Sequence, residues 1–465
     1  MRVALVNTNR MRPPIGPIGL DYIAESLAAS GHTVDMLDLC WAADCTAAIA
    51  SFFRSREYGL VGVSLRNTDD CANSSRQSFV GEFTSLVKTI RAHTSAFVVV
   101  GGVGFSVMPE SILQVCDADG GVWADGEGPL IQLAEKLEAY EDLQSVENLI
   151  LPSRNGWTCT AACPEALDGL PPMSRAWIDN QRYFREGGQA GFETKRGCAQ
   201  ACTYCADPVA KGRMVRLRSP EAVVHEVGCL VKQGIDHLHT CDSEFNLPQD
   251  HALEVCCAFV DHKLNEKTRW YAYCSARRFS AKLARAMRRA GCVGINFGVD
   301  SGDDGMLRRL KRDYVAEDII RVARLCREAG ITVMFDLLLG SPGETEASIR
   351  STLETMRIAQ PDQVGISLGV RVYPGTELAQ HVAHLNPQGQ ACIADPEQPV
   401  FFMEPAVAET AVDLLDRLIG DDRRFFFFDS SRPERNYNYN ANEVLVDAIA
   451  VGRRGAYWDI LRRTS

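Results

Sequence analysis

The sequence has no apolar run long enough to cross a membrane and no excess of positive charge. Every apolar segment is shorter than the about 18–20 residues that span a bilayer. The chain has 49 lysines and arginines against 60 aspartates and glutamates, and its formal charge of −11 disfavours bulk binding to nucleic acid. The opening MRVALVNTNR lacks the apolar stretch and cleavage site of a signal peptide. We therefore expect a chain of the reducing cytoplasm, without a membrane span.

Repeats and low-complexity segments are also missing. With 46% hydrophobic and 23% charged residues, the composition excludes global disorder, a collagen-like fibre and a small disulfide scaffold. A length of 465 residues allows about two to four domains. Cysteine, in contrast, is abundant, with 17 residues. In a reducing compartment these residues are expected to be thiols, metal ligands or small buried hydrophobes rather than disulfides.

Residues 1–140 alternate between strand and helix patterns. The expected strands cover residues 3–6, 34–39, 60–65, 97–100 and 121–124. The expected helices cover residues 20–29, 79–92 and 129–137. Repeated β-α units of this size predict an α/β domain with a doubly wound parallel sheet, whose ligands lie beyond the C-terminal ends of the strands.

The rest of the chain divides into three parts. Residues 141–190, rich in proline and glycine, are expected to form a linker with a short packed segment. Residues 191–385 carry six further strand-helix units, which predict a partial or full parallel (β/α) barrel. Residues 386–465 are expected to form a small substrate or lid region. It holds the aromatic run Phe425 to Phe428, the polar stretch Asn436 to Asn440, and a helix over 442–451.

Three cysteines stand in the array C-x3-C-x2-C, at Cys198, Cys202 and Cys205. At this cysteine content, chance alone places such an array in the chain about 0.02 times. Three thiolates on one short loop can bind three irons of a [4Fe-4S] cluster and leave the fourth iron open to a substrate or cosubstrate. The alternatives are a zinc site with a distant fourth ligand and three unrelated core cysteines.

The array resembles the cluster motif of the radical S-adenosylmethionine (SAM) enzymes, in which an aromatic residue such as Tyr204 precedes the third cysteine. The resemblance implies that the open iron binds the amino and carboxylate groups of SAM. It also implies that an electron from the cluster cleaves a carbon–sulfur bond of SAM. A donor such as flavodoxin or ferredoxin would supply that electron.

Four further segments of residues 190–380 resemble SAM-binding segments of the same family. Asp242 and Glu244 match a position where an acidic residue meets the SAM ammonium, and Asp300 and Ser301 match a position near its ribose. Two more matches are Lys311, near the carboxylate, and a glycine-rich loop with Gly340, Pro342 and Gly343. The alternatives are an ordinary solvated loop for the acidic pair and a surface helix lysine for Lys311.

The first domain resembles the cobalamin-binding domain found in many of these enzymes. The resemblance rests on Pro14 to Gly19 and on the segments 61–64, 100–102 and 125–128. It implies that glycines at strand ends allow a corrin to lie across the sheet edge, namely Gly101, Gly102 and Gly126. Arg66 and Asn67 follow a buried strand and are candidate corrin or substrate contacts. The alternative role for them is loop and helix capping.

The cobalt-binding motif Asp-x-His-x-x-Gly is absent, and His32 and His93, the only histidines of the domain, are expected to be solvated. The expected cofactors are thus a [4Fe-4S] cluster, SAM, and cobalamin without a protein histidine ligand. The resemblance implies cobalamin-assisted methyl transfer to a small-molecule substrate, by a transferase of a biosynthetic pathway. Three alternatives remain: cobalamin-independent transfer of a 3-amino-3-carboxypropyl group, modification of nucleic acid, and a non-catalytic iron–sulfur or metal-binding protein. The acidic net charge of the chain disfavours modification of nucleic acid.

Overall fold

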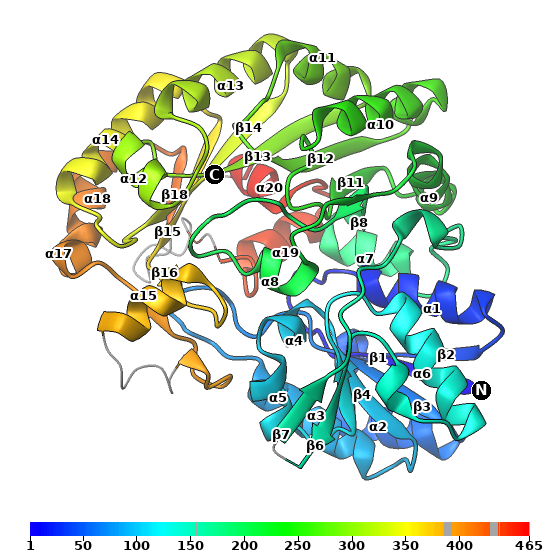
Figure 1. Ribbon diagram of the computed structural model, residues 1–465. Helices are drawn as coiled ribbons and strands as arrows, with labels where there is room; N and C mark the ends of the chain where they lie inside the picture. Colours follow the sequence, from blue (N-terminus) through cyan, green and yellow to red (C-terminus); the bar gives the residue numbers. More distant parts are fainter. Residues whose placement is uncertain (155, 386–392, 428–435, 437, 465) are drawn as a thin grey trace.

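The computed structural model describes residues 1–154, 156–385, 393–427, 436 and 438–464. Two seven-stranded sheets dominate it, one formed mainly by the first third of the chain and one by the middle (Figure 1). Their order in space is β2-β1-β3-β4-β5-β6-β7 for the first and β18-β15-β14-β13-β12-β11-β8 for the second. Within the described residues, no helix is both long and apolar enough to cross a membrane.

The first sheet is parallel over β1 to β5, and β6 and β7 extend it as antiparallel strands. Its strands are β1 Arg2–Asn7, β2 Thr33–Asp38, β3 Leu60–Ser64, β4 Phe97–Gly101, β5 Gly120–Val122, β6 Leu149–Ser153 and β7 Gly156–Cys159. Its helices are α1 Ile18–Ala29, α2 Cys45–Arg54, α3 Val80–Arg91, α4 Val103–Val107, α5 Pro109–Val115 and α6 Glu127–Ala139.

Separate apolar cores cover the two faces of this sheet, with α1 and α6 on one face and α2, α3 and α5 on the other. The double cover explains why β4 is an unbroken apolar run rather than an alternating one. The strand order changes direction between β1 and β3, and ligands bind at such a point beside the C-terminal strand ends.

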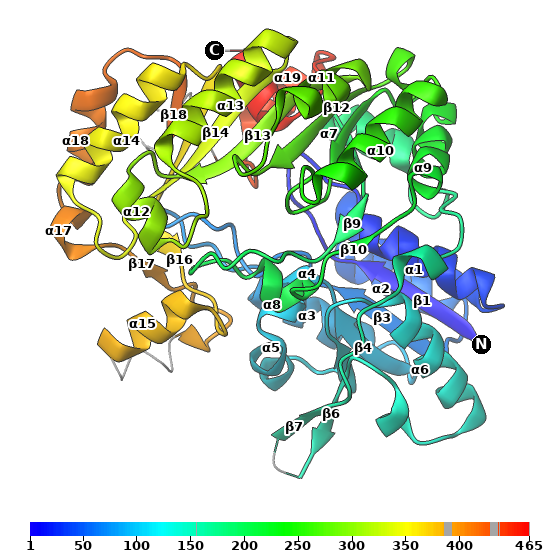
Figure 2. The same cartoon turned by 45° about the horizontal axis from the view of Figure 1, so that its top comes forward.

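The second sheet is parallel throughout and curves into an open barrel with helices on its outer face (Figures 1 and 2). Its strands are β8 Ala190–Phe192, β11 His237–Thr240, β12 Arg269–Cys274, β13 Cys292–Asp300, β14 Thr332–Leu339, β15 Gln363–Leu368 and β18 Phe425–Phe427. The outer helices are α9 Pro220–Lys232, α10 Gln249–Asp261, α11 Ala281–Arg289, α13 Ala316–Ala329, α14 Glu346–Ala359 and α18 Ala411–Ile419.

The remaining elements are short. The strands among them are β9 Lys195–Arg196, β10 Arg216–Leu217, β16 Val370–Arg371 and β17 Phe401–Phe402. The helices are α7 Asn180–Gly187, α8 Asp207–Lys211, α12 Asp304–Arg309, α15 Glu377–Leu385, α17 Pro405–Ala408, α19 Glu443–Ala450 and α20 Tyr457–Arg462. The last two lie inside the curve of the barrel sheet (Figure 1), where Trp458 packs against Tyr271 and the Tyr271 hydroxyl donates to Asp459 at 2.8 Å.

Two boundaries differ from those expected. The region 141–190 was expected to be a linker with a short packed segment, and in the structure it contains β6 and β7, whose apolar residues complete the edge of the first sheet. The C-terminal region supplies β18, a seventh barrel strand that pairs with β15. Phe425, Phe426 and Phe427 are buried in that strand, while Phe428 lies outside the described residues. The expected helix over 442–451 is α19.

Candidate active site

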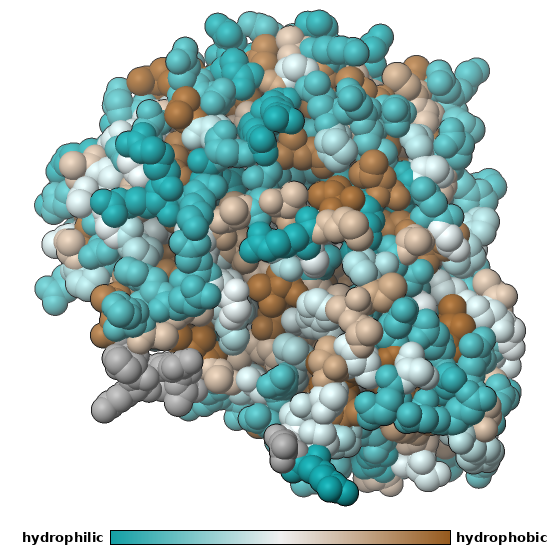
Figure 3. Space-filling model, in the orientation of Figure 1, coloured by the Kyte–Doolittle hydropathy of each residue, from teal (hydrophilic) through white to brown (hydrophobic). Residues whose placement is uncertain are grey.

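A cavity of about 1040 Å³ lies between the two sheets. Its first wall is the C-terminal edge of the first sheet, with residues that follow β1, β3, β4 and β5, and its second wall comes from β8, β11, β12 and β15 of the barrel. Both walls are the edges at which these two architectures bind ligands. The volume is at the upper end of the roughly 300–1,000 Å³ typical of small-molecule pockets, so the cavity suits a large cofactor. Figure 3 shows hydrophobic side chains toward the middle of this face, where the two halves meet.

Arg66 enters the cavity from the loop after β3. Among the described residues no carboxylate forms an ion pair with it. Its Nη1 donates to the Met11 sulfur at 3.2 Å, and the Asn67 amide lies beside it. Burial lowers the pKa of Arg66. A partly buried cation without a carboxylate partner is unfavourable, so a polar ligand in the cavity would compensate it.

The expected glycines Gly101, Gly102 and Gly126 all line the cavity. At Gly102, φ is +98° and an added Cβ would lie 2.5 Å from the Leu65 carbonyl oxygen. Glycine is therefore required there by the packing of the protein's own loop, whether or not a ligand is bound.

Neither histidine of the first domain lines the cavity. His32 is buried, contrary to the expectation that it is solvated, and its Nδ1 lies 3.1 Å from the amino group of Met1. The exposed His93 contacts only its own helix, through the Thr89 carbonyl oxygen. The cavity thus fits a corrin that receives no histidine from the first domain.

The three cysteines Cys198, Cys202 and Cys205 line a separate cavity of about 120 Å³. Their loop follows β9 and begins at Gly197. Only glycine fits this position, because φ of Gly197 is +88° and an added Cβ would lie 2.1 Å from the Met214 carbonyl oxygen. Within the described part of the chain, no group of three or more His, Cys, Asp and Glu side chains is arranged to hold a single metal ion. The thiols instead surround a cavity, the arrangement that a cluster of several irons requires.

Burial raises the pKa of the Cys198 thiol to about 11 and also raises that of Cys202. Arg312 opposes the second shift, because its Nη1 donates to the Cys202 sulfur at 2.8 Å. Bound iron replaces the thiol protons, so cluster binding at this site releases protons. The Arg312 guanidinium then stabilises negative charge on the sulfur.

The two acidic candidates for the SAM ammonium differ in position. Glu244 lines the cysteine cavity and accepts a hydrogen bond from Gln200 at 3.1 Å, and burial raises its pKa. Asp242 does not line it. Its carboxylate accepts from the backbone N–H of Thr194 at 2.8 Å and from the Thr194 hydroxyl at 2.6 Å. Asp242 therefore fixes the loop before the cysteines, and Glu244 is the residue available to a ligand.

Asp300 lies beside the cysteine loop, where it accepts from the Tyr204 hydroxyl at 2.8 Å and pairs with Arg312. Ser301 is fully buried and hydrogen-bonds to Thr352 at 2.9 Å, so its hydroxyl is already engaged within the protein. Burial raises the pKa of Asp300 while Arg312 lowers it.

Lys311 and the glycine-rich loop lie elsewhere than expected. Lys311 is half exposed and pairs with Glu377 at 2.5 Å, because the chain turns at this residue with φ +58° and directs Arg312 inward instead. The loop with Gly340, Pro342 and Gly343 lines neither of the two cavities. Gly340 has a φ of +90°, a backbone conformation that favours glycine, so the fold of its own loop accounts for this residue.

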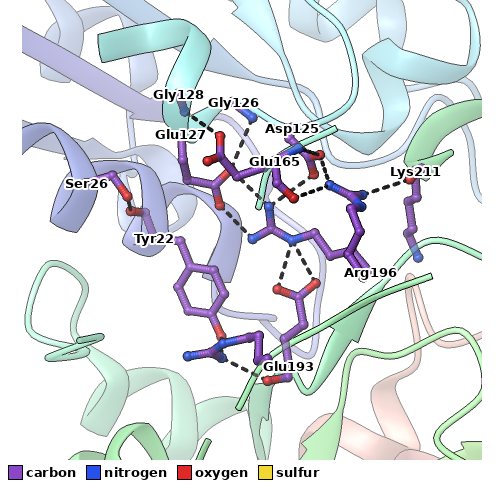
Figure 4. Close-up of polar contacts among 12 residues, drawn as sticks. Tyr22, Ser26, Asp125, Gly126, Glu127, Gly128, Glu165, Glu193, Arg196 and Lys211 are labelled. Atoms are coloured by element: carbon purple, nitrogen blue, oxygen red, sulfur yellow. Dashed lines mark hydrogen bonds and ion pairs between the residues drawn. The ribbon is translucent and has the colours of Figure 1, made fainter. Parts of the chain in front are cut away.

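A cluster of buried charges joins the two domains beside the cysteine loop (Figure 4). Arg196, two residues before Cys198, binds Glu127 at 2.6 and 2.9 Å, Asp125 at 3.1 Å and Glu193 at 2.9 and 3.0 Å. The sequence motif around Gly126 gave no sign of these partners, since they come from different domains. Burial raises the pKa of Glu193 to about 7, against the lowering effect of Arg196.

Sequence reasoning also missed Tyr273, which lines both cavities. It lies on β12 beside His239 of β11, with ring centroids 4.9 Å apart. The available signal was the alternation along β12, in which Tyr273 stands between the core residues Ala272 and Cys274 and so faces the other side of the sheet. The two cavities are therefore neighbours that share Tyr273 as a lining residue.

Two family models match the chain: the radical SAM superfamily over residues 192–356 and the B12 binding domain over residues 5–134. A tryptophan 2-C-methyltransferase of Streptomyces laurentii is 32% identical over 447 residues, which cover 82% of this chain and 74% of the relative. A tRNA-2-methylthio-N(6)-dimethylallyladenosine synthase of Caldicellulosiruptor saccharolyticus is 30% identical, but the match covers only 38% of this chain and 40% of that relative.

The solved structure of the radical SAM methyltransferase TsrM from Kitasatospora setae, with tryptophan and a SAM analogue bound, has a TM-score of 0.91 to this chain. It is 29% identical, and the match covers 100% of this chain and 97% of that one. A structure of the same enzyme with cobalamin and a [4Fe-4S] cluster gives 0.89, at 28% identity and the same coverage. The predicted fold class, the transferase assignment and the three cofactors are thereby confirmed. The chain belongs to the radical SAM superfamily, as an enzyme in which a B12-binding domain and an open barrel enclose a common cavity.

Proposed function

We propose that this enzyme transfers a methyl group from SAM to a carbon of the indole ring of tryptophan or a close analogue. The observation that carries the proposal is the full-length similarity to a methyltransferase solved with tryptophan, in a chain whose cysteine and corrin cavities are neighbours. The cavity wall supports an aromatic substrate, because Tyr273, Tyr439, Tyr457 and Trp458 all contribute to it. Aromatic side chains favour stacked or edge-on contacts with a planar ring.

The cobalamin and the cluster, when bound, supply methyl-group and one-electron chemistry that no side chain can supply. The protein's residues bind and orient the reactants. Cys198, Cys202 and Cys205 would hold the cluster, and Glu244, which lines the same cavity, would accept from the SAM ammonium. Arg66 lines the cavity at the edge of the first sheet and would contact the corrin or the substrate there.

The C-terminal region 386–465 would act as a cover for the cavity. Asn438 and Asn440 donate to the side chain and the backbone carbonyl of Asp70 at 3.1 Å each, which joins this region to the loop after β3. Tyr439 between them lines the cavity. Substrate entry would therefore require these contacts to open.

We further propose that the enzyme works in the cytoplasm on a small molecule rather than on nucleic acid, with flavodoxin or ferredoxin as electron donor. The formal charge of −11 supports the choice of substrate class. The 17 cysteines support a reducing compartment.

The test is an anaerobic assay of protein reconstituted with iron, sulfide and cobalamin. Incubation with SAM, a reductant and L-tryptophan is expected to give methyltryptophan and S-adenosylhomocysteine, measured by mass spectrometry. The triple cysteine-to-alanine variant is the control and should give neither. Absence of methylated product, with 5′-methylthioadenosine as the main nucleoside, would refute methyl transfer and favour transfer of a 3-amino-3-carboxypropyl group.

A further inference from the structure

Two polar side chains, Asn296 and Asp336, lie on the inner face of the barrel sheet, where most neighbouring residues are apolar. Asn296 belongs to β13 and Asp336 to β14. Along β14 the residues on either side of Asp336, Phe335 and Leu337, pack into the core against the outer helices. Since side chains alternate along a strand, Asp336 faces the inside of the barrel.

The pair lies between strands whose inner residues line the large cavity. Asn296 is paired in register with Tyr273 of β12, and Asp336 is paired with Gly365 of β15, two residues before Ser367. Tyr273 and Ser367 both line the cavity. The two polar groups therefore stand on the two strands between Tyr273 and Ser367, next to the barrel wall of the cavity but not among its lining residues.

Each of the two side chains has one oxygen that receives no hydrogen bond from the described residues. Asn296 Nδ2 donates to one oxygen of Asp336 at 2.6 Å. The other oxygen of Asp336 and the amide oxygen of Asn296 are buried and have no hydrogen-bond partner among the described residues. No lysine or arginine of the described chain forms an ion pair with Asp336. An unpaired buried carboxylate is strongly unfavourable, as is a buried carbonyl oxygen without a donor.

Two adjacent oxygen acceptors, one of them anionic, define the chemistry of their ligand. An ammonium group has three N–H donors and a positive charge, so it can satisfy both oxygens. A carboxylate would be repelled, and a single hydroxyl could satisfy only one oxygen. We propose that Asp336 and Asn296 bind the ammonium group of the substrate and so orient its ring beneath the corrin cavity.

This inference rests on the proposed function and names the group by which the enzyme would distinguish an amino acid or amine from other indoles. The ionisation of Asp336 supports it. Burial and the neighbouring Asp300 raise the pKa of Asp336 to about 7, while the hydrogen bond from Asn296 lowers it. The titratable groups that face Asp336 are Tyr273 of β12, Asp300 of β13 and Tyr439 of the C-terminal region. None of them is a cation, so a cationic ligand has no competitor there.

The test measures binding of three indoles to the reconstituted enzyme by equilibrium dialysis at pH 8. L-Tryptophan and tryptamine carry an ammonium group, and 3-indolepropionate does not. Wild-type protein is expected to bind the first two at least about tenfold more tightly than the third, as for a charge-assisted hydrogen bond. Asp336→Asn should remove that preference and leave the affinity for 3-indolepropionate unchanged or higher. Glu317→Gln, an exposed carboxylate on α13, is the matched control and should behave as wild type.

The outcomes separate this inference from the proposed function. If wild-type protein binds all three indoles equally, the ammonium site is refuted, whatever the variants do, while the proposed reaction stands. A folded Asp336→Asn variant that keeps the preference refutes it as well. If wild-type protein binds no indole, the proposed substrate class is wrong, and the inference fails with it.

Discussion

Replacing Arg196 by methionine should destabilise the contact between the two domains. The Arg196 side chain is 11% exposed, and its partners Glu127 and Asp125 are 3% and 5% exposed. Arg216 still pairs with Asp125 in the variant, but among the described residues no other cation forms an ion pair with Glu127 or Glu193. Removing one partner of a buried ion pair lowers the free energy of unfolding by about 3–5 kcal/mol, because the remaining charge is left uncompensated.

The size of the expected melting shift depends on which part of the chain unfolds together. At about 2.1 cal/mol/K per residue, unfolding of all 465 residues has an entropy near 1 kcal/mol/K, so the cost lowers Tm by about 3–5 °C. If the first ~160 residues melt alone, the same cost lowers Tm by about 9–15 °C. Differential scanning calorimetry of the apoprotein distinguishes the two cases.

Two companion variants test the electrostatic reasoning. Adding Glu127→Gln to Arg196→Met should recover part of the loss, because the unpaired charge is removed, and the double-mutant cycle measures that coupling. Arg350→Met on α14 is the control: Arg350 is 53% exposed and 3.8 Å from Glu346, so its loss should cost less than about 1 kcal/mol. If the melting temperatures of the Arg196→Met and Arg350→Met proteins agree within about 1 °C, the argument is refuted.

Three further predictions follow from the site. Replacing all three cysteines of the triplet by alanine should abolish the cluster, and iron and sulfide analysis of anaerobically reconstituted protein checks this. Arg312→Gln should lower the reduction potential of the cluster, because a cation beside Cys202 stabilises the more negative reduced state; an EPR-monitored redox titration with an unshifted midpoint would contradict it. Affinity for L-tryptophan should rise about tenfold from pH 6 to pH 8, because Asp336, with a pKa of about 7, is mostly protonated and neutral at the lower pH. The Asp336→Asn variant should show no such rise, and equal pH profiles for variant and wild type would exclude Asp336 as the titrating group.

Local patterns predicted most of the strands and helices on which the site is built. The strand-helix alternation of residues 1–140 corresponds to β1 through α6, and the six expected barrel strands are present. The pattern missed β6, β7 and β18, because short strands at sheet edges are defined by the partners they pair with rather than by their own periodicity. For the same reason the packed segment expected within residues 141–190 was not identified as two strands of the first sheet.

The roles of single residues were harder to predict than the elements that carry them. Of two neighbouring acidic residues, Glu244 faces the cysteine cavity and Asp242 fixes the backbone of Thr194. Of two neighbouring basic residues, Arg312 faces Cys202 and Lys311 lies at the surface. Adjacent side chains point in different directions, and the local backbone turn decides which one enters the site.

The sequence by itself determined what depends on near neighbours in the chain. The spacing of Cys198, Cys202 and Cys205 places three thiols on one loop, and the first domain lacks the motif Asp-x-His-x-x-Gly, whose histidine binds cobalt in other cobalamin domains. Only the tertiary structure decided what depends on distant segments. Register between parallel strands brings Asn296 to Asp336, and docking of the two domains brings Arg196 to Glu127. These contacts join residues 40 and 69 positions apart, where no local periodicity operates, so packing of whole sheets and domains selects them.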